Sequence, residues 1–434
     1  MSDSAPSGAV PLPGDVGQAD TDRLESAPLT GPSSAVIPAP PGPGPREVHA
    51  PPDLQEPAAV SEAGDRSSDV SPQPTRTTWL APDQPGPLPG LAFNLHKLPG
   101  QGEDADPILR QGTDVALIGV LDGMGGAGGT EYETPDGPRT GAYLGSRVAR
   151  DAAERSVLSM VSVDAELDGP ALADALHGEL LAALSARLTE LHAPPSRLRS
   201  RLLRTLPTTM ALAVVQRRAG DPATWHCHLF WAGDSRVYLL RPDSGAQQLT
   251  VDDIRDRGDA MANLRQDSLV SNAVSAETPF TVNYRRVTVA APCLLLAATD
   301  GCFGYLPSPM HFERTVVNAL CNAATTADWS LELQRSITAV AGDDAAMAIV
   351  GVGADHDQFR AIFASRLREL DVSYLEPLDD AAAAVRAAEE QLATATALHD
   401  DRAASLWAGY KTSYAAYLDD PSGSASISAE TDTS

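Results

Sequence analysis

The chain has 434 residues, of which 58 are acidic and 32 are basic, so its formal net charge at pH 7 is -26. A charge of that sign argues against nucleic acid or an anionic membrane as a partner, and we expect neither. The four cysteines have no CxxC spacing, and no apolar run reaches the roughly 18 residues that a membrane-spanning helix needs. The composition therefore predicts a cytoplasmic protein.

Residues 1–90 are dominated by Pro, Ser, Ala, Gly and Asp, and they contain 19 of the 35 prolines. Such a segment buries too little apolar surface to offset the entropy of ordering it, so it predicts a disordered tail. Residues 38–45, PAPPGPGP, could serve as a proline-rich ligand, but a solvated linker is the favoured interpretation. The Ser- and Asp-rich residues 419–434 predict a second disordered tail.

The predicted elements begin at residue 91 and consist of runs of strands separated by pairs of helices. Apolar runs predict the strands, and leucines at helical spacing together with Ala-rich stretches predict the helices. Strands are expected at 91–98, 115–121, 208–217, 225–242, 280–289, 293–298 and 345–353, and helices at 140–163, 168–191, 309–324 and 329–340. Gly233 interrupts the strand at 225–242, which predicts a bulge or a tight hairpin that exposes Asp234.

These elements divide the chain into a tail at 1–90, a folded domain at 91–354, a helical appendage at 355–418 and a tail at 419–434. Trp407, Tyr410, Tyr414 and Tyr417 are spaced to lie on one face of a helix in the appendage. Because aromatic stripes usually belong to a core, we expect this face to pack on the body of the protein. A surface for a partner is the alternative.

Carboxylates recur at the ends of the predicted strands. The pairs are Glu103 with Asp104, Asp122 with Gly123, Asp300 with Gly301, and Asp343 with Asp344. One Asp-Gly pair alone is typical of an ordinary turn, but strands of one sheet system bring their ends together, and clustered carboxylates repel unless cations neutralise them. The pattern therefore predicts a site for two Mg²⁺ or Mn²⁺ ions that activates a water for hydrolysis of a phosphate ester.

Six motifs in order then resemble the type 2C metal-dependent Ser/Thr protein phosphatases, in their bacterial form. They are DGMGG at 122–126, PTTMALAVV at 207–215, AGDSRVYLL at 232–240, LTVDD at 249–253, ATDG at 298–301 and GDDAAMAIV at 342–350. The resemblance covers residues 91–353. It implies an α+β fold, a four-layer α-β-β-α sandwich of two antiparallel sheets flanked by helices.

The resemblance also implies roles for single residues. Asp122, Asp300 and Asp343 would be the catalytic carboxylates. Asp122 would bridge two metals, the Gly123 carbonyl would hold one of them, and Asp300 and Asp343 would hold the other. Glu103 and Asp104 would orient metal-bound waters. Asp234 would bind a weaker third metal, and Asp344 would accept hydrogen bonds around the site.

The sequence departs from the family pattern at positions that matter for catalysis. Pro99 stands where many members have a phosphate-binding arginine, a role that Lys97 or His96 could take over. Met124 replaces a histidine of many eukaryotic members, and Ala346 replaces a Ser or Thr. A further departure is Asp253 in place of a histidine. An inserted segment at 130–139 is expected beside the metal-binding cleft that the resemblance implies.

We therefore expect a metal-dependent hydrolase acting on phosphoserine or phosphothreonine in proteins, with a phosphoprotein substrate or a Ser/Thr kinase as partner. The main alternative is a weak or inactive phosphatase-like module that binds and regulates phosphoproteins. Two further hypotheses are less favoured. Gly123, Gly125 and Gly128 satisfy GxGxxG, the pattern of dinucleotide-binding sites. The prolines that follow delay the start of the helix whose N-terminus would bind the dinucleotide. His226 and His228 share one face of a strand and could bind zinc, but the sequence has no further zinc ligands at suitable spacing.

Overall fold

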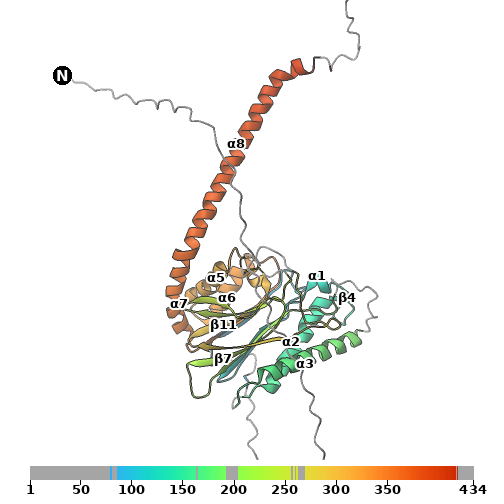
Figure 1. Cartoon of the computed structure of the whole chain (residues 1–434), viewed down its shortest axis with the longest axis vertical. Helices are drawn as coiled ribbons and strands as arrows, with labels where there is room; N and C mark the ends of the chain where they lie inside the picture. Colours follow the sequence, from blue (N-terminus) through green and yellow to red (C-terminus); the bar gives the residue numbers. More distant parts are fainter. Residues whose placement is uncertain are drawn as a thin grey trace, which may run out of the picture. The chain divides into compact units, whose positions relative to one another are not determined.

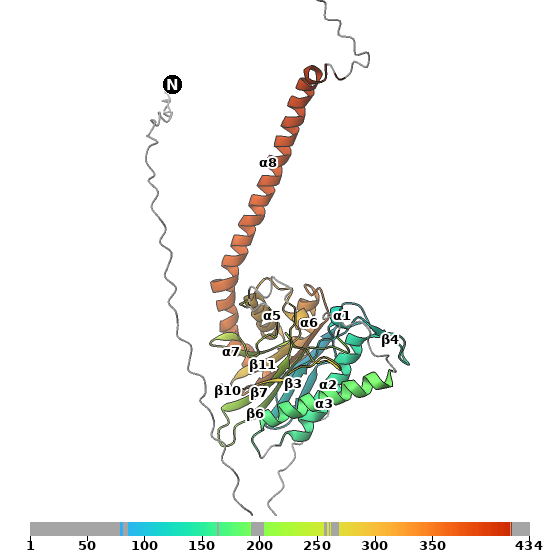
Figure 2. The same cartoon turned by 45° about the vertical axis from the view of Figure 1, so that its right-hand side comes forward.

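The structure is a computed structural model, and it describes residues 79–80, 86–162, 165–191, 204–255, 258–259, 261, 269–416 and 418. The predicted tails at 1–90 and 419–434 lie almost entirely outside these residues. The described part forms two five-stranded antiparallel sheets with helices on both outer sides, as Figures 1 and 2 show. The predicted α+β sandwich is therefore confirmed.

The first sheet has the strand order β1-β12-β11-β8-β9 and the second has the order β10-β7-β6-β3-β2. The first sheet consists of β1 (Gly90–Leu95), β12 (Ala345–Val352), β11 (Cys293–Ala298), β8 (Arg236–Arg241) and β9 (Gly245–Gln248). The second consists of β10 (Asn283–Ala290), β7 (Thr224–Ala232), β6 (Met210–Arg217), β3 (Val115–Val120) and β2 (Ile108–Gln111). Every residue of β3, β11 and β12 is buried, which explains why these strands are continuous apolar runs in the sequence.

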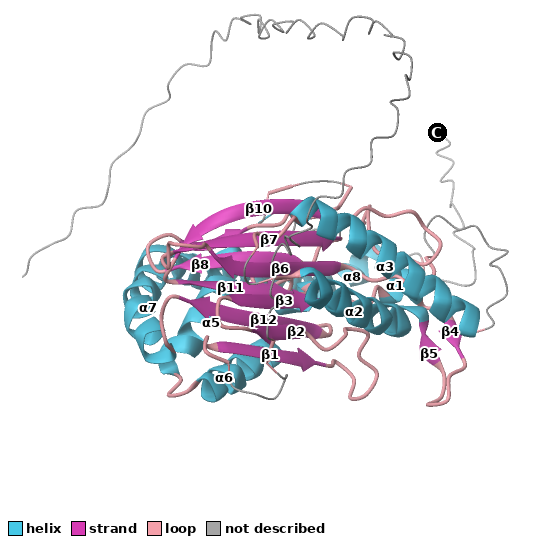
Figure 3. Cartoon of the chain, turned by 90° about the horizontal axis from the view of Figure 1, so that it is seen from below, coloured by secondary structure: helices cyan, strands magenta, loops and turns pink. Residues whose placement is uncertain are grey.

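Helices cover the outer face of each sheet (Figure 3). The helices α2 (Gly141–Met160) and α3 (Gly169–Glu190) share a core with the second sheet. The helices α5 (Pro309–Asn322), α6 (Thr326–Thr338) and α7 (His356–Leu370) share another core with the first sheet. Each of these helices starts at a Ser, Thr or Asp whose side chain accepts a hydrogen bond from the first turn.

A third apolar cluster lies between the two sheets. Because side chains alternate along a strand, Val115 and Leu117 of β3 face the helices, whereas Ala116, Ile118 and Val120 face the other sheet. Many residues in this inner layer are small, which lets the two sheets approach closely.

The predicted bulge or hairpin at Gly233 is wrong. The strands β7 and β8 on either side of it belong to different sheets, so the chain crosses from one sheet to the other at residues 233–235. Gly233 has φ 108°, a backbone conformation that glycine adopts without strain. The apolar pattern continues through the crossing because both strands are buried, and for that reason the sequence did not reveal a change of sheet.

The helix α8 (Glu376–Tyr414) follows α7 through a π-helical turn at Asp371–Leu375. None of its 39 residues is buried. The expectation that its aromatic face packs on the body is therefore wrong for Trp407, Tyr410 and Tyr414, which contact one another and are exposed. Tyr417 lies outside the described residues. No helix in the described part of the chain, α8 included, is long and apolar enough to cross a membrane.

Candidate functional site

A cleft of about 690 Å³ contains the residues that the sequence singled out. Its lining comes from segments that are far apart in the chain and meet where strands of both sheets end. The lining includes Glu103, Asp104, Asp122, Gly123, Asp234, Asp300, Asp343 and Asp344, and also Met124, Gly125, Gly126, Ala127, Thr209, Leu269 and Val270. Every residue of the predicted metal set is thus in one cavity.

Asp122 lies two residues beyond the last residue of the buried strand β3, and its main chain is fixed by the segment that leads into β6. Its carbonyl accepts hydrogen bonds from the Thr209 amide at 2.8 Å and from the Thr208 hydroxyl at 2.6 Å. The glycines after it form only the four-residue helix α1 (Gly125–Gly128), and α2 starts at Gly141. The dinucleotide hypothesis therefore lacks the long helix that it requires.

Asp104 and Asp300 are connected through Thr299. The Thr299 hydroxyl donates to Asp104 Oδ2 at 2.9 Å and accepts from the Ala346 amide at 2.9 Å. Asp300 follows directly and starts a short 3-10 turn at Asp300–Cys302. A hydroxyl next to the carboxylates is therefore present although residue 346 is alanine. This role of Thr299 was not predicted, and the Thr-Asp-Gly triplet after β11 was the signal that could have revealed it.

Asp344 holds the loop that leads to Glu103. Its Oδ1 accepts from the Lys97 amide at 2.8 Å and its Oδ2 accepts from the Glu103 amide at 2.6 Å. The Glu103 carboxylate in turn accepts from the Thr140 hydroxyl at 2.6 Å and lies against Gly125, where a Cβ atom would collide with it. The first and last carboxylate pairs of the chain are therefore joined by a direct hydrogen bond, from the Glu103 amide to Asp344.

The crossing between the sheets positions Asp234. The Gly233 amide donates to Asp253 Oδ2 at 3.2 Å, and the same oxygen accepts from the side-chain amides of Asn272 and Asn283. Asp253, which stands where the family resemblance leads us to expect histidine, thus supports the crossing. Ser235 is buried and its hydroxyl pairs with that of Thr209 at 2.6 Å, so it is not placed as a nucleophile.

The electrostatics of the cleft disfavour several ionised carboxylates at once. Burial, followed by repulsion from neighbouring carboxylates, raises the pKa of Asp104 to about 8 and that of Asp234 to about 7. Burial and the charges of Asp104 and Asp300 raise the pKa of Asp122 well above its usual value. The pKa of Asp300 is also raised, by burial and by Asp343. The cleft is therefore a place where added positive charge is strongly favoured.

The donor chemistry of the cleft fits Mg²⁺ or Mn²⁺, since these cations prefer carboxylate and carbonyl oxygens. Among the residues that the structure describes, however, no three His, Cys, Asp or Glu side chains are grouped closely enough to hold a metal ion as they stand. Several carboxylates instead make hydrogen bonds within the protein, such as Asp104 with Thr299 and Glu103 with Thr140.

The described lining of the cleft contains no Lys, Arg or His. The nearest arginine in the motifs, Arg236, is buried and bound by both oxygens of Asp252, with its Nη1 donating to the Tyr238 hydroxyl. Arg139 is in a different situation. It is the first residue of β5 (Arg139–Thr140), which pairs with β4 (Glu131–Tyr132), and it stacks on Tyr143 and donates to the Gly100 carbonyl at 3.0 Å.

This places the Arg139 guanidinium against the residue that follows Pro99. Its neighbour Thr140 binds Glu103 directly, so the inserted segment at 130–139 reaches the rim of the cleft. Arg139 could not be predicted from the sequence, because a contact between residues 139 and 100 leaves no local pattern.

His226 and His228 do not form a zinc site with other described residues. His228 Nδ1 pairs with the Tyr284 hydroxyl at 3.0 Å and His226 Nδ1 pairs with the Thr288 hydroxyl at 3.2 Å. Burial and the nearby Arg286 lower the pKa of His228 to about 4. These histidines therefore belong to the side-chain packing on β7 and β10.

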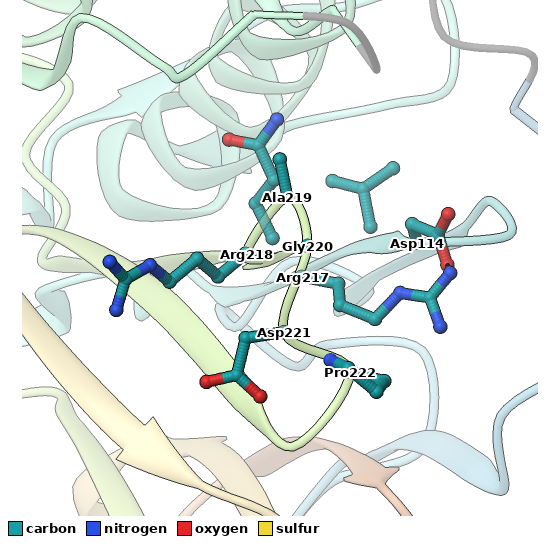
Figure 4. A pocket seen from close by; sticks show the side chains of 9 residues that line it. Asp114, Arg217, Arg218, Ala219, Gly220, Asp221 and Pro222 are labelled. Atoms are coloured by element: carbon teal, nitrogen blue, oxygen red, sulfur yellow. Dashed lines mark ion pairs between the residues drawn. The ribbon is translucent and has the colours of Figure 1, made fainter.

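A second hollow, of about 430 Å³, lies at the opposite end of β6 from the carboxylates. Figure 4 shows the side chains that line it. It is formed largely by the turn at residues 217–222. Arg217 forms an ion pair with Asp114 at 2.5 Å, and Arg218 and Asp221 are also part of the lining. Its charges are mixed, and it contains none of the predicted site residues.

No protein-family model and no curated protein matches the sequence. Solved structures do match. The serine/threonine phosphatase PstP/Ppp of Mycobacterium tuberculosis is 19% identical, with 62% of this chain and 99% of that chain covered and a TM-score of 0.41. Serine/threonine phosphatase Stp1 of Staphylococcus aureus is 13% identical, with 62% and 96% covered and a TM-score of 0.45.

A third match is the catalytic domain of PstP in complex with two manganese ions, at 18% identity, with 62% of this chain and 99% of that chain covered and a TM-score of 0.40. The chain is thus similar to solved bacterial serine/threonine phosphatases, the class of protein that its ordered motifs resemble.

Proposed function

We propose that the protein is a metal-dependent phosphatase that hydrolyses phosphoserine and phosphothreonine in proteins. The observation that carries this proposal is the convergence of carboxylates from five separate segments in one cleft, with the pKa values of five of these groups raised. Such an arrangement is unfavourable for a protein that binds nothing there, and it is favourable for one that binds divalent cations.

In this proposal Asp122, the Gly123 carbonyl, Asp300 and Asp343 hold two Mn²⁺ or Mg²⁺ ions, and Asp234 takes part in a third site. Glu103 and Asp104 orient water. The ions, when bound, supply the positive charge that acidifies a coordinated water and neutralises phosphoryl oxygens. We place the catalytic domain at residues 91–354 together with the helix α7, which shares its core, in the cytoplasm, with a phosphoprotein or its Ser/Thr kinase as partner.

The chain's own groups position the reactants. Thr299 holds Asp104 and lies next to Asp300, so it fixes the relative position of two of the carboxylates. Asp344 fixes the loop before Glu103. Arg139, at the rim, offers a guanidinium with the geometry to bind a phosphoryl group in two contacts. We assign it the phosphate-binding role that Pro99 cannot fill.

The test is hydrolysis of phosphopeptides and of an aryl phosphate by the purified full chain. We expect turnover with Mn²⁺ or Mg²⁺, none after chelation, and recovery when metal is restored. Peptides with phosphoserine and phosphothreonine should be better substrates than one with phosphotyrosine. Metal-saturated protein that shows no turnover would contradict the proposal.

A regulatory module that binds phosphoproteins without hydrolysis is the second candidate. The observation in its favour is the described lining of the cleft, which has neither a basic side chain to donate a proton nor one to hold phosphate. Met124 contributes only a thioether at the position of a proton donor. Phosphopeptide binding that requires metal but leads to no released phosphate would favour this candidate.

A further inference from the structure

The helix α8 carries a stripe of large apolar side chains on one side. At about 100° of rotation per residue, seven of them fall within an arc of about 100°. We define the α8 stripe as Leu378, Val385, Leu392, Leu406, Trp407, Tyr410 and Tyr414. The charged residues of the helix lie mostly on the other side, and Glu389 and His399 are the ionisable residues within the described stripe.

The α8 stripe is exposed to water along its whole length. The exposed fractions of its seven side chains range from 41% to 68%. Burying a Leu or Val removes roughly 60 to 120 Å² of surface at about 25 cal/mol per Å², and an aromatic side chain brings about 150 to 250 Å². The exposed part of the stripe therefore amounts to roughly 400 to 700 Å², which approaches the share of about 800 Å² that one partner contributes to an ordinary stable interface.

The sequence of α8 is complementary to itself when two copies run in opposite directions. The first turns are rich in alanine, and the last turns carry the aromatic residues. An antiparallel pair centred on Thr394 sets large side chains of one copy against smaller ones of the other. The opposed positions are Leu378 with Tyr410, Ala381 with Trp407, Ala382 with Leu406, Val385 with Ala403, Leu392 with Thr396, and Glu389 with His399.

A parallel pair has no such complementarity. It would oppose each residue to its own copy, so that Trp407 meets Trp407, alanine meets alanine and Glu389 meets Glu389. The contact between two tryptophans is overpacked, and the contact between two alanines leaves empty space. The contact between two glutamates brings like charges together. Antiparallel pairing also sets the helix dipoles in opposite directions.

We propose that the protein forms a homodimer through the α8 stripe, with the two α8 helices antiparallel and the two-fold axis near Thr394. The dimer does not depend on the proposed phosphatase activity. Because the helix is about 58 Å long at 1.5 Å per residue, antiparallel pairing places the points where the two chains enter α8 near opposite ends of the pair.

The first experiment is sedimentation of the full chain at about 1 to 100 µM, a range in which interfaces of this size associate. We expect a dimer, and we expect Leu392→Glu and Trp407→Glu to raise its dissociation constant by about 100-fold or more. Leu398→Glu is the matched control. Leu398 is 71% exposed on the opposite side of the same helix, so this change should leave the dimer intact.

Circular dichroism and thermal unfolding of each variant show whether its helices and sheets remain folded. A wild-type chain that stays monomeric over the whole range overturns the proposal. So does a Leu398→Glu variant that weakens the dimer as much as Leu392→Glu does.

The second experiment tests the direction of the helices by mild oxidation of cysteine variants. Glu389→Cys and His399→Cys together should give a covalent dimer, because these positions face each other in the antiparallel pair, whereas each single variant should give none. Covalent dimers of the single variants would overturn the antiparallel arrangement. The wild-type chain, whose own four cysteines are present in every variant, is the control.

Discussion

The carboxylate cleft and the helix α8 hold side chains in opposite kinds of unfavourable surroundings. In the cleft, acidic groups crowd around the buried Asp104, and the pKa values of Asp104 and Asp234 rise to about 8 and about 7. On α8, leucines and aromatic rings are surrounded by water. Each arrangement is costly for the isolated chain, and each indicates the chemistry of what binds there: cations in the cleft and an apolar surface on the helix.

The largest expected effect follows from removing a carboxylate at the centre of the cleft. Asp122→Asn should lower metal-dependent phosphate hydrolysis by about a thousandfold or more, since it removes a proposed ligand of both ions. The same change should raise the melting temperature of the metal-free protein, because a repelling charge is lost, and should reduce the further rise on adding Mn²⁺.

Asp221→Asn is the control, because this carboxylate lies in the second hollow. If Asp122→Asn turns over substrate like the wild type, the cleft has no role in catalysis.

A second change tests how tightly the carboxylate loops pack. A Cβ atom on Gly301 would collide with the main-chain carbonyl of Asp344. Gly301→Ala should therefore destabilise the fold by about 1 to 3 kcal/mol and lower activity by about 100-fold, since it displaces Asp300. Gly178→Ala on α3, where a Cβ meets no atom within 4 Å, should leave both the melting temperature and the activity nearly unchanged.

The third prediction concerns the pH dependence of stability. The pKa values of Asp104 and Asp234 are raised in the folded protein, so between about pH 4 and pH 8 the folded state binds more protons than the unfolded state. The metal-free protein should therefore lose stability as the pH rises through this window, and the stabilisation by Mn²⁺ should grow with pH. Calorimetry at pH 5 and pH 8, with and without metal, measures both slopes.

A metal-free melting temperature that rises steadily toward pH 8 would mean that these carboxyl groups are already ionised at low pH.

The fourth prediction concerns substrate binding at the rim. Arg139→Ala should raise KM for a phosphopeptide by about tenfold, the effect of losing roughly 1.4 kcal/mol of phosphate binding, and should change kcat little. Arg139→Lys should recover part of the loss, because it restores the charge but not the two-point contact.

Arg218→Ala is the matched control, since Arg218 lines the second hollow. A fall in kcat without a change in KM would remove Arg139 from the substrate-binding role.

The smallest effect on stability and turnover is expected from removing the helix α8. Ending the chain after Leu375 removes α8, none of whose residues is buried. The free energy of unfolding of the sheets should change by less than about 1 kcal/mol and the turnover should remain the same, while the dimer should be lost. A large drop in the melting temperature would show that α8 packs on the body after all.

The buried strands were the most predictable part of the fold. The strands β3, β11 and β12 are apolar throughout, and they were expected close to where they occur. The short strands β2 and β9 were missed, because four residues with mixed polarity carry little periodic signal.

The candidate site likewise has features that could be predicted from the sequence and features that could not. Acidic residues beside glycines at strand ends can be recognised locally, and all of them line one cleft. The crossing at Gly233, the bonds of Thr299 and the contact of Arg139 with Gly100 depend on pairs that are distant in the sequence. On α8 the pattern correctly identified an aromatic face, but a pattern cannot state what covers it.

The hydrogen bonds that Asp344 accepts from the amides of Lys97 and Glu103 also constrain the order of folding during synthesis. They join residues 241 and 247 positions apart, and β1 pairs directly with β12. A growing chain that has emerged only as far as α6 has most of its carboxylates but cannot hold the first pair in place. The carboxylate cleft of the nascent protein should therefore be complete only after β12 has left the ribosome.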